Sequence, residues 1–357
     1  MVLQLNNAVF CYFNLIEFFM PHFLSPNQID EIISSLPTPD EKTQNKAFAR
    51  QAKLSKPNGS LGRLEDVAIW MAGWQRRERP SIENGQCLVF AGNHGVVEQG
   101  ISPFPAEVTA QMVSNFMAGG AAINQLCELA DIKLDIITLD LDHPTNDLSL
   151  GPAMTENEVL AAMNRGADAL DANCDYLVVG EMGIGNSTSA AALCLGRFGA
   201  DAAGWVGPGT GLNEKGVKHK AKVIEVAIAK QGPIAPNAVA LLAAFGGREL
   251  AAIAGAVLAA RMRSIPVMLD GYISTAAASV LTANGQLSVL DHTMIAHMSP
   301  EPGHLQLAVA LNKQPLVDLR MRLGEASGAA VASLLVRAAC ATHNGMATFA
   351  EAGVSGG

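Results

Sequence analysis

The stretch YLVVGEMGIGNSTSAAAL, residues 176–193, passes from an apolar run through a glycine-rich turn into an alanine-rich segment. A short apolar run of this kind is typical of a buried strand, and the alanine-rich segment suits a helix that packs closely on a sheet. Strand, turn and helix in this order make up most of a βαβ unit, which favours a parallel sheet.

The same alternation continues on both sides of this stretch, from Pro80 to about residue 325. It predicts an α/β domain in which helices flank a parallel sheet. We expect helices before it, from Ser25 to Arg79, with Ser25-Pro26 as a helix start, and again after Gly324. The predicted strands are CLVFAG (87–92), LDIITLD (134–140), YLVVGE (176–181), ALLAAFGG (240–247), PVMLDG (266–271) and TMIAHMS (293–299).

The composition is that of a folded protein with a sizeable core, because 49% of the 357 residues are hydrophobic and 16% are charged. This length fits two domains, or one large α/β domain with an appendage. A net charge of −9 argues against nucleic acid or an anionic membrane as a partner, since both attract basic surfaces. The six cysteines lie singly, with no CxxC pair, so we expect reduced thiols and a cytoplasmic protein.

Residues 1–20, MVLQLNNAVFCYFNLIEFFM, are apolar but lack the positive stretch and the small-residue cleavage site of a signal peptide. Glu17 and the asparagines argue against a membrane-spanning helix. Two interpretations of residues 1–19 stay open: an over-extended start, with the true start at Met20, or an apolar helix that docks on the body. If Met20 is the true start, deletion of residues 1–19 leaves activity intact.

Polar or glycine-rich segments follow five of the six predicted strands: AGNHGV, GEMGIGNSTS, FGGRE, LDGYIS and AHMSPEPGH. In an open parallel sheet, ligands bind outside the carboxyl ends of the strands. Five such segments at one edge therefore predict a single composite site. The alternative is that these loops use glycine and asparagine only to turn the chain.

The segment GEMGIGNSTS (180–189) combines features of an anion site. Gly183 and Gly185 let a ligand approach the backbone, and Asn186, Ser187 and Thr188 supply helix caps and donors at a helix N-terminus. The segment is neither a Walker A motif nor GxGxxG. A phosphate cradle and a plain capped turn both stay open.

A second glycine-rich loop, GPGTGLNEKGVKHK (207–220), ends in Lys215, Lys218, His219 and Lys220. A lysine that reaches a phosphate or carboxylate is the functional interpretation. A solvated basic helix start is the structural one, and it is the commoner case for any single lysine.

The loop HMSPEPGH (297–304) places Ser299, Glu301, Gly303 and His304 in a proline-bent segment. Together with His292, its histidines suggest a metal, but they are five and seven residues apart, with no HExxH and no companion cysteine. We therefore expect no metal site.

Glu325 in RLGEASGAA (322–330) comes just before a predicted helix start. It is either a carboxylate that stabilises the first turn of that helix or a general base that faces a cleft, and spacing does not separate the two. The chain lacks the GxSxG nucleophile elbow, a Ser-His-Asp order and the acidic pair of diphosphate-dependent phosphoribosyltransferases.

Together these segments resemble the family of nicotinate-nucleotide–dimethylbenzimidazole phosphoribosyltransferases, which assemble the lower-ligand nucleotide of cobalamin. Ten blocks run in order from about residue 56 to residue 355, and it is their combination that is specific. The blocks are KPNGSLGRLE, FAGNHGV, PFPAEVTAQMV, GEMGIGNSTSAAAL, GPGTGL, FGGRELAAIAGAVLAA, PVMLDGYISTAAA, HMSPEPGH, RLGEASGAA and MATFAEAGVS.

The resemblance implies a Rossmann-like, six-stranded parallel sheet flanked by helices, and a homodimer. It also implies a small helical domain, residues 20–80 plus 326–357, beside an α/β catalytic domain at residues 81–325, with residues 1–19 as an apolar extension. The implied reaction joins nicotinate mononucleotide to 5,6-dimethylbenzimidazole and gives α-ribazole 5′-phosphate and nicotinate. These small molecules are the implied partners, and no cofactor is expected.

The resemblance also implies roles for individual residues. Glu325 matches the proton acceptor of the family, Glu181 a second carboxylate near the site, and Lys220 a lysine at the nucleotide end. The implied substrate-binding residues are Ser102, Phe104, Gly183, Ile184, Gly185, Asn186, Ser187, Thr188, Lys220, Asp270, Gly271, Ser299, Glu301 and Gly303.

The chain departs from the family pattern at two positions: Ala106 stands where many members carry Gln, and Asn93 where Asp is also common. The first change leaves the accepted base open, because that Gln would help to hold the azole. Two alternative functions also stay open. One is a phosphoribosyltransferase or nucleoside-type hydrolase that acts on another base, and the other is a non-catalytic nucleotide- or azole-binding protein.

Overall fold

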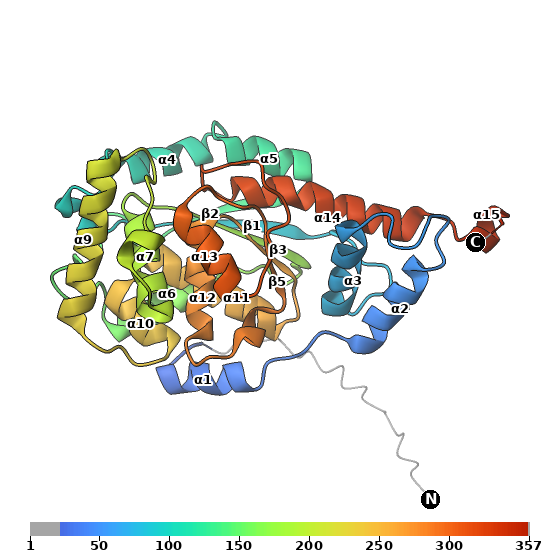
Figure 1. The fold of residues 1–357 in the computed structure, drawn as a ribbon, viewed down its shortest axis with the longest axis horizontal. Coiled ribbons are helices and arrows are strands. Elements are labelled where there is room, and N and C mark those ends of the chain that lie inside the picture. Colours follow the sequence, from blue (N-terminus) through green and yellow to red (C-terminus); the bar gives the residue numbers. More distant parts are fainter. Residues whose placement is uncertain (1–21, 356–357) are drawn as a thin grey trace, which may run out of the picture.

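The computed structural model describes residues 22–355, and within them five strands form one parallel sheet in the order β2-β1-β3-β4-β5 (Figure 1). This confirms the α/β class and the parallel sheet. The strands are β1 Gly85–Ala91, β2 Lys133–Thr138, β3 Tyr176–Met182, β4 Val267–Leu269 and β5 Thr293–Ile295.

The expectation of six strands is wrong, because residues 240–247 do not form a strand. They lie in helix α10, Ala238–Phe245, and the two residues after it; Asn237 caps this helix by accepting the Ala240 N–H at 2.8 Å. Residues 240–247 contain no β-branched residue, and their alanines and leucines are strong helix formers. Composition and cap therefore outweigh the short apolar run that favoured a strand.

The helices confirm the predicted helical segments at both ends of the chain. Ser25 caps the first helix by accepting the Gln28 N–H, and Pro26 is its first residue. The helices are α1 Pro26–Ser34, α2 Glu41–Gln51, α3 Arg63–Gln75, α4 Glu107–Met117, α5 Ala122–Ala130, α6 Glu156–Asp168, α7 Asn186–Phe198, α8 Ala202–Trp205, α9 Glu214–Gln231, α10 Ala238–Phe245, α11 Arg248–Met262, α12 Tyr272–Ser279, α13 Pro302–Ala310, α14 Ser327–Gly345 and α15 Phe349–Ala352.

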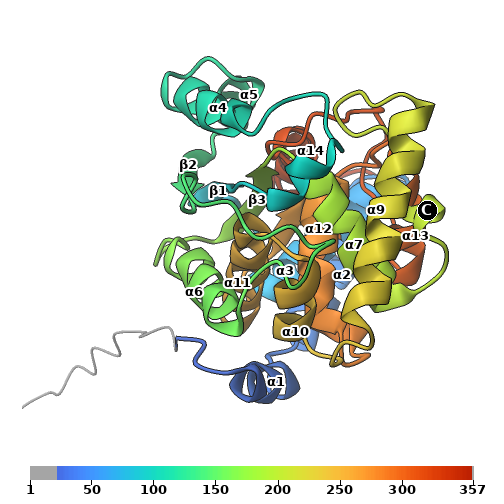
Figure 2. The same cartoon turned by 90° about the vertical axis from the view of Figure 1, so that its left-hand side faces the viewer.

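Helices cover both faces of the sheet (Figure 2). Successive residues of a strand point to opposite faces, so Leu88 and Phe90 join the core beneath α6 and α11, while Cys87 and Val89 join the core beneath α5 and α14. All of β1 is buried, as expected for a strand covered on both sides.

The strand order locates the edge at which a ligand binds. From β1 the chain passes to β2 on one side, and it then returns to β3 on the other side of β1. This reversal makes a crevice at the carboxyl ends of β1 and β3, where open α/β sheets bind ligands. The order 2-1-3-4-5 is that of flavodoxin-type sheets.

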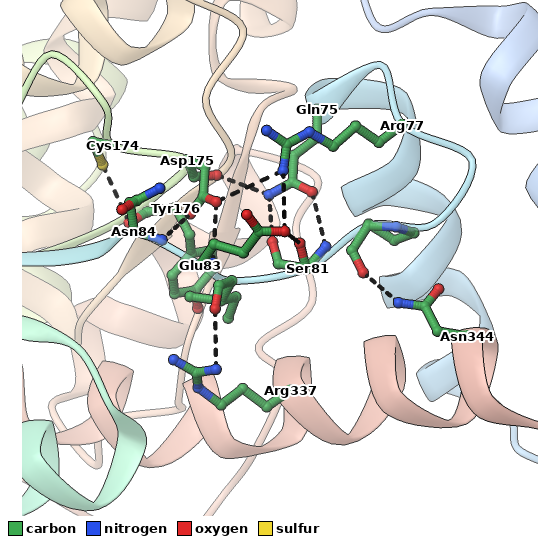
Figure 3. Close-up of polar contacts among 12 residues, drawn as sticks. Gln75, Arg77, Ser81, Glu83, Asn84, Cys174, Asp175, Tyr176, Arg337 and Asn344 are labelled. Atoms are coloured by element: carbon green, nitrogen blue, oxygen red, sulfur yellow. Dashed lines mark hydrogen bonds and ion pairs between the residues drawn. The ribbon is translucent and has the colours of Figure 1, made fainter.

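Polar side chains fasten the opposite edge of the sheet, where β1 and β3 begin (Figure 3). Asp175 accepts the N–H groups of Glu83 and Asn84, each at 3.1 Å. Gln75 at the end of α3 donates to the carbonyls of Ser81 and Asp175 and accepts the Ser81 N–H. Arg337 of α14 donates to the carbonyl of Ile82. These bonds hold α3, the start of β1 and α14 together.

The helical segments at the two chain ends pack in different places. Phe23, Ile29 and Ile33 join the core of α6, α10 and α11, whereas α14 packs on α3, α5 and β3. The predicted domain division stays a prediction. Our expectation for residues 1–19 lies outside the described residues. Among residues 22–355, no helix is both long enough and apolar enough to span a membrane.

Candidate active site

A cavity that opens to solvent lies at the carboxyl edge of the sheet. Three of the five polar segments line it, those after β3, β4 and β5, so the prediction that all five form one composite site holds only in part. The lining comprises residues 181–187, 208–210, 270–273 and 322–324, with Ile101, Ser102, Lys220, His297, Ser299 and Glu301.

Most of the predicted site residues line this cavity, and the roles given to them stay predictions. The ones that line it are Ser102, Glu181, Gly183, Ile184, Gly185, Asn186, Ser187, Lys220, Asp270, Gly271, Ser299 and Glu301. Four others are not part of the lining: Phe104, which is exposed, and Thr188, Gly303 and Glu325, which are buried.

The N-terminus of α7 forms one wall of the cavity. Gly185 is its N-cap residue with φ 93°, a left-handed conformation that favours glycine. The Ile184 N–H donates to the Thr109 hydroxyl of α4 at 3.1 Å, which holds the loop in place. A helix N-terminus in a cavity wall favours an anion.

Lys220 of α9 is buried beside this wall, unlike Lys215 and Lys218. Its Nζ donates to the Ser187 hydroxyl at 3.1 Å and to the Gly207 carbonyl at 3.3 Å. Burial lowers the pKa of Lys220, although the charge of Glu301 opposes this shift. The solvated-helix interpretation therefore fails for Lys220, whose ammonium group reaches the first turn of α7.

Two buried glutamates, Glu181 of β3 and Glu325 in the turn before α14, have shifted pKa values. Glu181, near the end of β3, accepts a hydrogen bond from the Asn186 side chain. Burial, together with the charges of Asp270, Glu249 and Glu325, raises the pKa of Glu181 to about 8. Burial and the charge of Asp270 raise the pKa of Glu325 to about 7. Both groups can therefore exchange a proton near neutral pH.

Glu325 stands in a tight turn directly before α14, next to Gly324 of the cavity lining. Gly324, Glu325 and Ala326 all have positive φ, at 80°, 61° and 64°, and such a conformation costs free energy in residues other than glycine. The Glu325 N–H donates to the Glu181 carbonyl at 3.2 Å, which ties the turn to β3. Gly180 makes this possible, because a side chain there would overlap the backbone of Ala326.

Asp270, directly after β4, makes its polar contacts with other groups of the protein. Its Oδ1 accepts the Ala329 N–H at 3.0 Å, which caps α14, and lies 3.5 Å from His297 Nε2. Burial opposes the charged imidazole, but the bond and charge of Asp270 raise the pKa of His297. Asp270 thus fixes the start of the helix that follows Glu325.

The 299–304 loop packs against the glycine-rich loop 207–211. Glu301 accepts the Gly209 N–H at 2.8 Å, and the Ser299 N–H donates to His304 Nδ1 at 2.9 Å. Gly303 is buried against the Trp205 carbonyl and the Tyr272 ring, where a side chain would not fit. Within residues 22–355, no group of three His, Cys, Asp or Glu side chains is arranged to hold a metal ion.

Our sequence analysis missed several residues of the cavity. Tyr272, His297 and Arg322 line it, and all three lie within motifs quoted for the resemblance. The polar segments AGNHGV and FGGRE are outside the lining, yet they supply His94 and Glu249, whose side chains meet behind the 183–185 loop. The only hint of these two residues in the sequence was that each segment follows a predicted strand.

The chain is similar to known phosphoribosyltransferases. The family model described as phosphoribosyltransferase matches residues 36–354. A relative from Novosphingobium aromaticivorans, named nicotinate-nucleotide–dimethylbenzimidazole phosphoribosyltransferase, is 52% identical over 95% of this chain and 100% of its own. A relative of the same name from Rhodobacter capsulatus is 51% identical over 92% of this chain and 97% of its own.

Solved structures show the same fold. The crystal structure of CobT from Thermus thermophilus superposes with a TM-score of 0.83 at 39% identity, over 88% of this chain and 100% of that one. A crystal structure of the nicotinate-nucleotide–dimethylbenzimidazole phosphoribosyltransferase from the same organism gives 0.83 at 37% identity, over 89% of this chain and 100% of that one. The chain therefore belongs to the nicotinate-nucleotide–dimethylbenzimidazole phosphoribosyltransferase family.

Proposed function

We propose that this chain transfers the phosphoribosyl group of nicotinate mononucleotide to 5,6-dimethylbenzimidazole. The products are α-ribazole 5′-phosphate, for the lower ligand of cobalamin, and nicotinate. The observation that carries the proposal is a cavity lined by the buried Glu181, the anion-binding start of α7 and Lys220, with the buried Glu325 in the turn directly next to this lining.

The leaving group needs no acid catalyst. In the donor nucleotide the nicotinate ring is a pyridinium. When the bond between its nitrogen and C1′ breaks, the electron pair stays on that nitrogen, which thereby becomes neutral. Catalysis is therefore required on the side of the attacking azole. This accounts for a site whose central ionisable groups are carboxyls.

Glu325 takes the proton of the attacking base. One azole nitrogen forms the new bond to C1′, and the N–H proton of the other nitrogen passes to the Glu325 carboxylate. A pKa of about 7 suits this task, because the group is substantially ionised at neutral pH and is still basic enough to accept a proton. Glu181 accepts a hydrogen bond from the Asn186 side chain and so stabilises the part of the cavity wall between the azole and the α7 loop.

The phosphate of the donor binds at the N-terminus of α7, where Ser187 and Lys220 meet. Attack from the face opposite nicotinate inverts C1′ and gives the α-linkage. The loops after β4 and β5, with Asp270, Gly271 and Ser299, line the remaining part of the phosphoribosyl pocket. Holding the two substrates in line and excluding water supplies much of the rate, because hydrolysis competes at C1′.

The choice of base depends on the region around Ala106. This residue is directly before α4, whose Thr109 holds the α7 loop. With alanine in place of the Gln of many members, the azole keeps fewer polar contacts there.

Product analysis tests the proposal. Purified protein is incubated with nicotinate mononucleotide and 5,6-dimethylbenzimidazole, and both products are followed by chromatography. Equimolar nicotinate and an α-linked ribazole phosphate are the expected result. Nicotinate alone would show a hydrolase, and the absence of any reaction, with tight azole binding, would show a binding protein; either outcome contradicts the proposal.

The protein also acts as a homodimer in the cytoplasm under this proposal. The family resemblance supports the dimer, and cysteines that lie singly in the sequence, with no CxxC pair, support the cytoplasm. Light scattering coupled to size-exclusion chromatography measures the mass in solution against 37.3 kDa for one chain. A single-chain mass at micromolar concentration would contradict the dimer.

A further inference from the structure

We infer that the buried His94–Glu249 pair positions the 183–187 loop for the phosphate of the donor nucleotide, an inference that rests on the proposed function. The pair is outside the cavity lining and touches none of the reacting groups directly. It acts through the start of α7, so both residues are positioning residues.

The pair joins three segments that are distant in sequence. His94, which follows β1, has its Nε2 2.6 Å from Glu249 Oε1 at the start of α11. His94 Nδ1 lies 3.0 Å from the Ser189 hydroxyl in the first turns of α7. One imidazole therefore links the loop after β1 to α7 and to α11.

The 183–187 loop rests directly on this pair. A side chain at Gly183 would come within 3.2 Å of Glu249 Oε1 and 2.7 Å of the Gly92 carbonyl. Side chains at Gly92 and Gly247 would likewise collide with the Glu249 carboxylate, at 2.5 and 2.7 Å from Oε2. Three glycines thus let the backbones after β1, β3 and α10 close around a single carboxylate.

Stability alone does not account for this arrangement. Both side chains are fully buried, and Glu249 Oε2 has no hydrogen-bond partner within the described chain. Burying such a pair costs about as much as its attraction returns, and well-packed apolar residues would do as well. The pair instead sets an orientation: the two hydrogen bonds of His94 fix the rotation of α7 about its own axis.

The rotation of α7 sets the groups at its N-terminus. Ser189 is one turn or less from Asn186 and Ser187, which face the cavity. Ser187 binds Lys220, and Asn186 binds Glu181. When the link to Ser189 is lost, α7 shifts and the donors for the phosphate no longer converge.

The test compares two donors that differ only in the phosphate. The ratio of kcat/KM for nicotinate mononucleotide to kcat/KM for nicotinate riboside is measured for wild type and for His94→Phe, which keeps the ring but loses both bonds. We expect the ratio to fall about tenfold to a hundredfold, because displacement of positioning groups by about 1 Å has an effect of this size. A general folding defect would lower both values together and leave the ratio unchanged, and that result would overturn the inference.

Milder variants keep the test decisive if His94→Phe does not fold. Ser189→Ala removes one hydrogen bond, worth about 0.5–1.5 kcal/mol, or about two- to tenfold in the ratio. Glu249→Gln retains an oxygen for His94 and preserves most of the wild-type ratio. Parallel loss with both donors in Ser189→Ala, or full loss of the ratio in Glu249→Gln, contradicts positioning through α7.

The chain offers a matched control on its surface. His143 Nδ1 lies 2.8 Å from Asp140 Oδ1, but these side chains are 78% and 52% exposed. His143→Phe leaves the ratio unchanged. Calorimetric binding of nicotinate mononucleotide and of the riboside, without any azole, separates the two proposals: a wild type that binds both donors but makes no product contradicts the proposed function, while the binding ratio still tests the pair.

Discussion

A carboxylate lies at each end of strand β3, and the two have different surroundings. Asp175 is half-buried and Glu181 is buried. Asp175, just before the strand, accepts two backbone N–H groups, one at each oxygen (Figure 3). Glu181, near the end of the strand, is buried, accepts from the Asn186 side chain and lies near the charges of Asp270, Glu249 and Glu325. The pKa of Glu181 is raised to about 8 as a result.

The two edges of the sheet therefore have different roles: the carboxylate where β3 begins supports the fold, and the carboxyl group where β3 ends is suited to chemistry. A carboxylate whose two oxygens each accept a backbone N–H stabilises the fold. A carboxyl group that is poorly compensated is costly to ionise and is ready to exchange a proton near neutral pH. The carboxyl edge accumulates groups of the second kind, and each prediction below tests this contrast.

The largest effect is expected for Glu325→Gln. The amide keeps the shape of the side chain but does not accept the azole proton, so kcat falls by about 10²–10⁴ while the fold is retained. Steady-state kinetics and circular dichroism measure the two properties. Near wild-type turnover would move the base to Glu181.

The next largest effect is expected for Gly180→Ala. A methyl group at this position overlaps the backbone of Ala326, so the turn that carries Glu325 moves. We expect a loss of about 1–3 kcal/mol in the free energy of unfolding, with a lower kcat. Gly151→Ala is the control, because nothing lies within 4 Å of the added carbon. Equal behaviour of the two variants would show that the turn tolerates displacement.

Asp175→Asn should affect stability alone. The amide replaces one of the two acceptors by a donor, which leaves an N–H of Glu83 or Asn84 unpaired and costs about 1–3 kcal/mol. Urea unfolding measures this loss, and kcat stays at the wild-type value. A large fall in kcat at unchanged stability would contradict the different roles assigned to the two edges of the sheet.

A further effect is a pH dependence of stability. Glu181 and Glu325 have pKa values of about 8 and about 7 in the folded protein, against 4.5 ordinarily, so from pH 4.5 to about 8 the folded state binds more protons than the unfolded state. The free energy of unfolding from these groups is therefore greatest below pH 4.5 and falls as the pH rises. Glu181→Gln should gain Tm relative to wild type between pH 5 and pH 9, and a constant or reversed difference would contradict this.

The fold class and the place of the site follow from local sequence patterns. Short apolar runs located all five strands, and the rule that ligands bind at the carboxyl edge grouped residues after β3, β4 and β5 that line one cavity. The run at 240–247 failed because a short apolar segment fits a strand and a buried helix equally well. Its lack of β-branched residues and the Asn237 cap were the signals to weigh.

The finer features of the site depend on contacts between distant segments. Nothing near Lys220 in the sequence shows that it is buried, because its surroundings come from Ser187 and Gly207. The left-handed turn at Glu325 requires Gly180, and Asp270 caps α14 from another strand. Such pairings are set by tertiary packing, and local patterns do not encode them.

The central claim is that Glu325 accepts the azole proton, and the pH dependence of kcat tests it most directly. Turnover of nicotinate mononucleotide with 5,6-dimethylbenzimidazole is measured from pH 5.5 to pH 9 for wild type and for Glu325→Gln. The account predicts that wild-type kcat rises with pH through about 7, where Glu325 loses its proton, and levels off above it, while the variant is slow and lacks this rise. The same rise in the variant, at comparable kcat, would contradict the account.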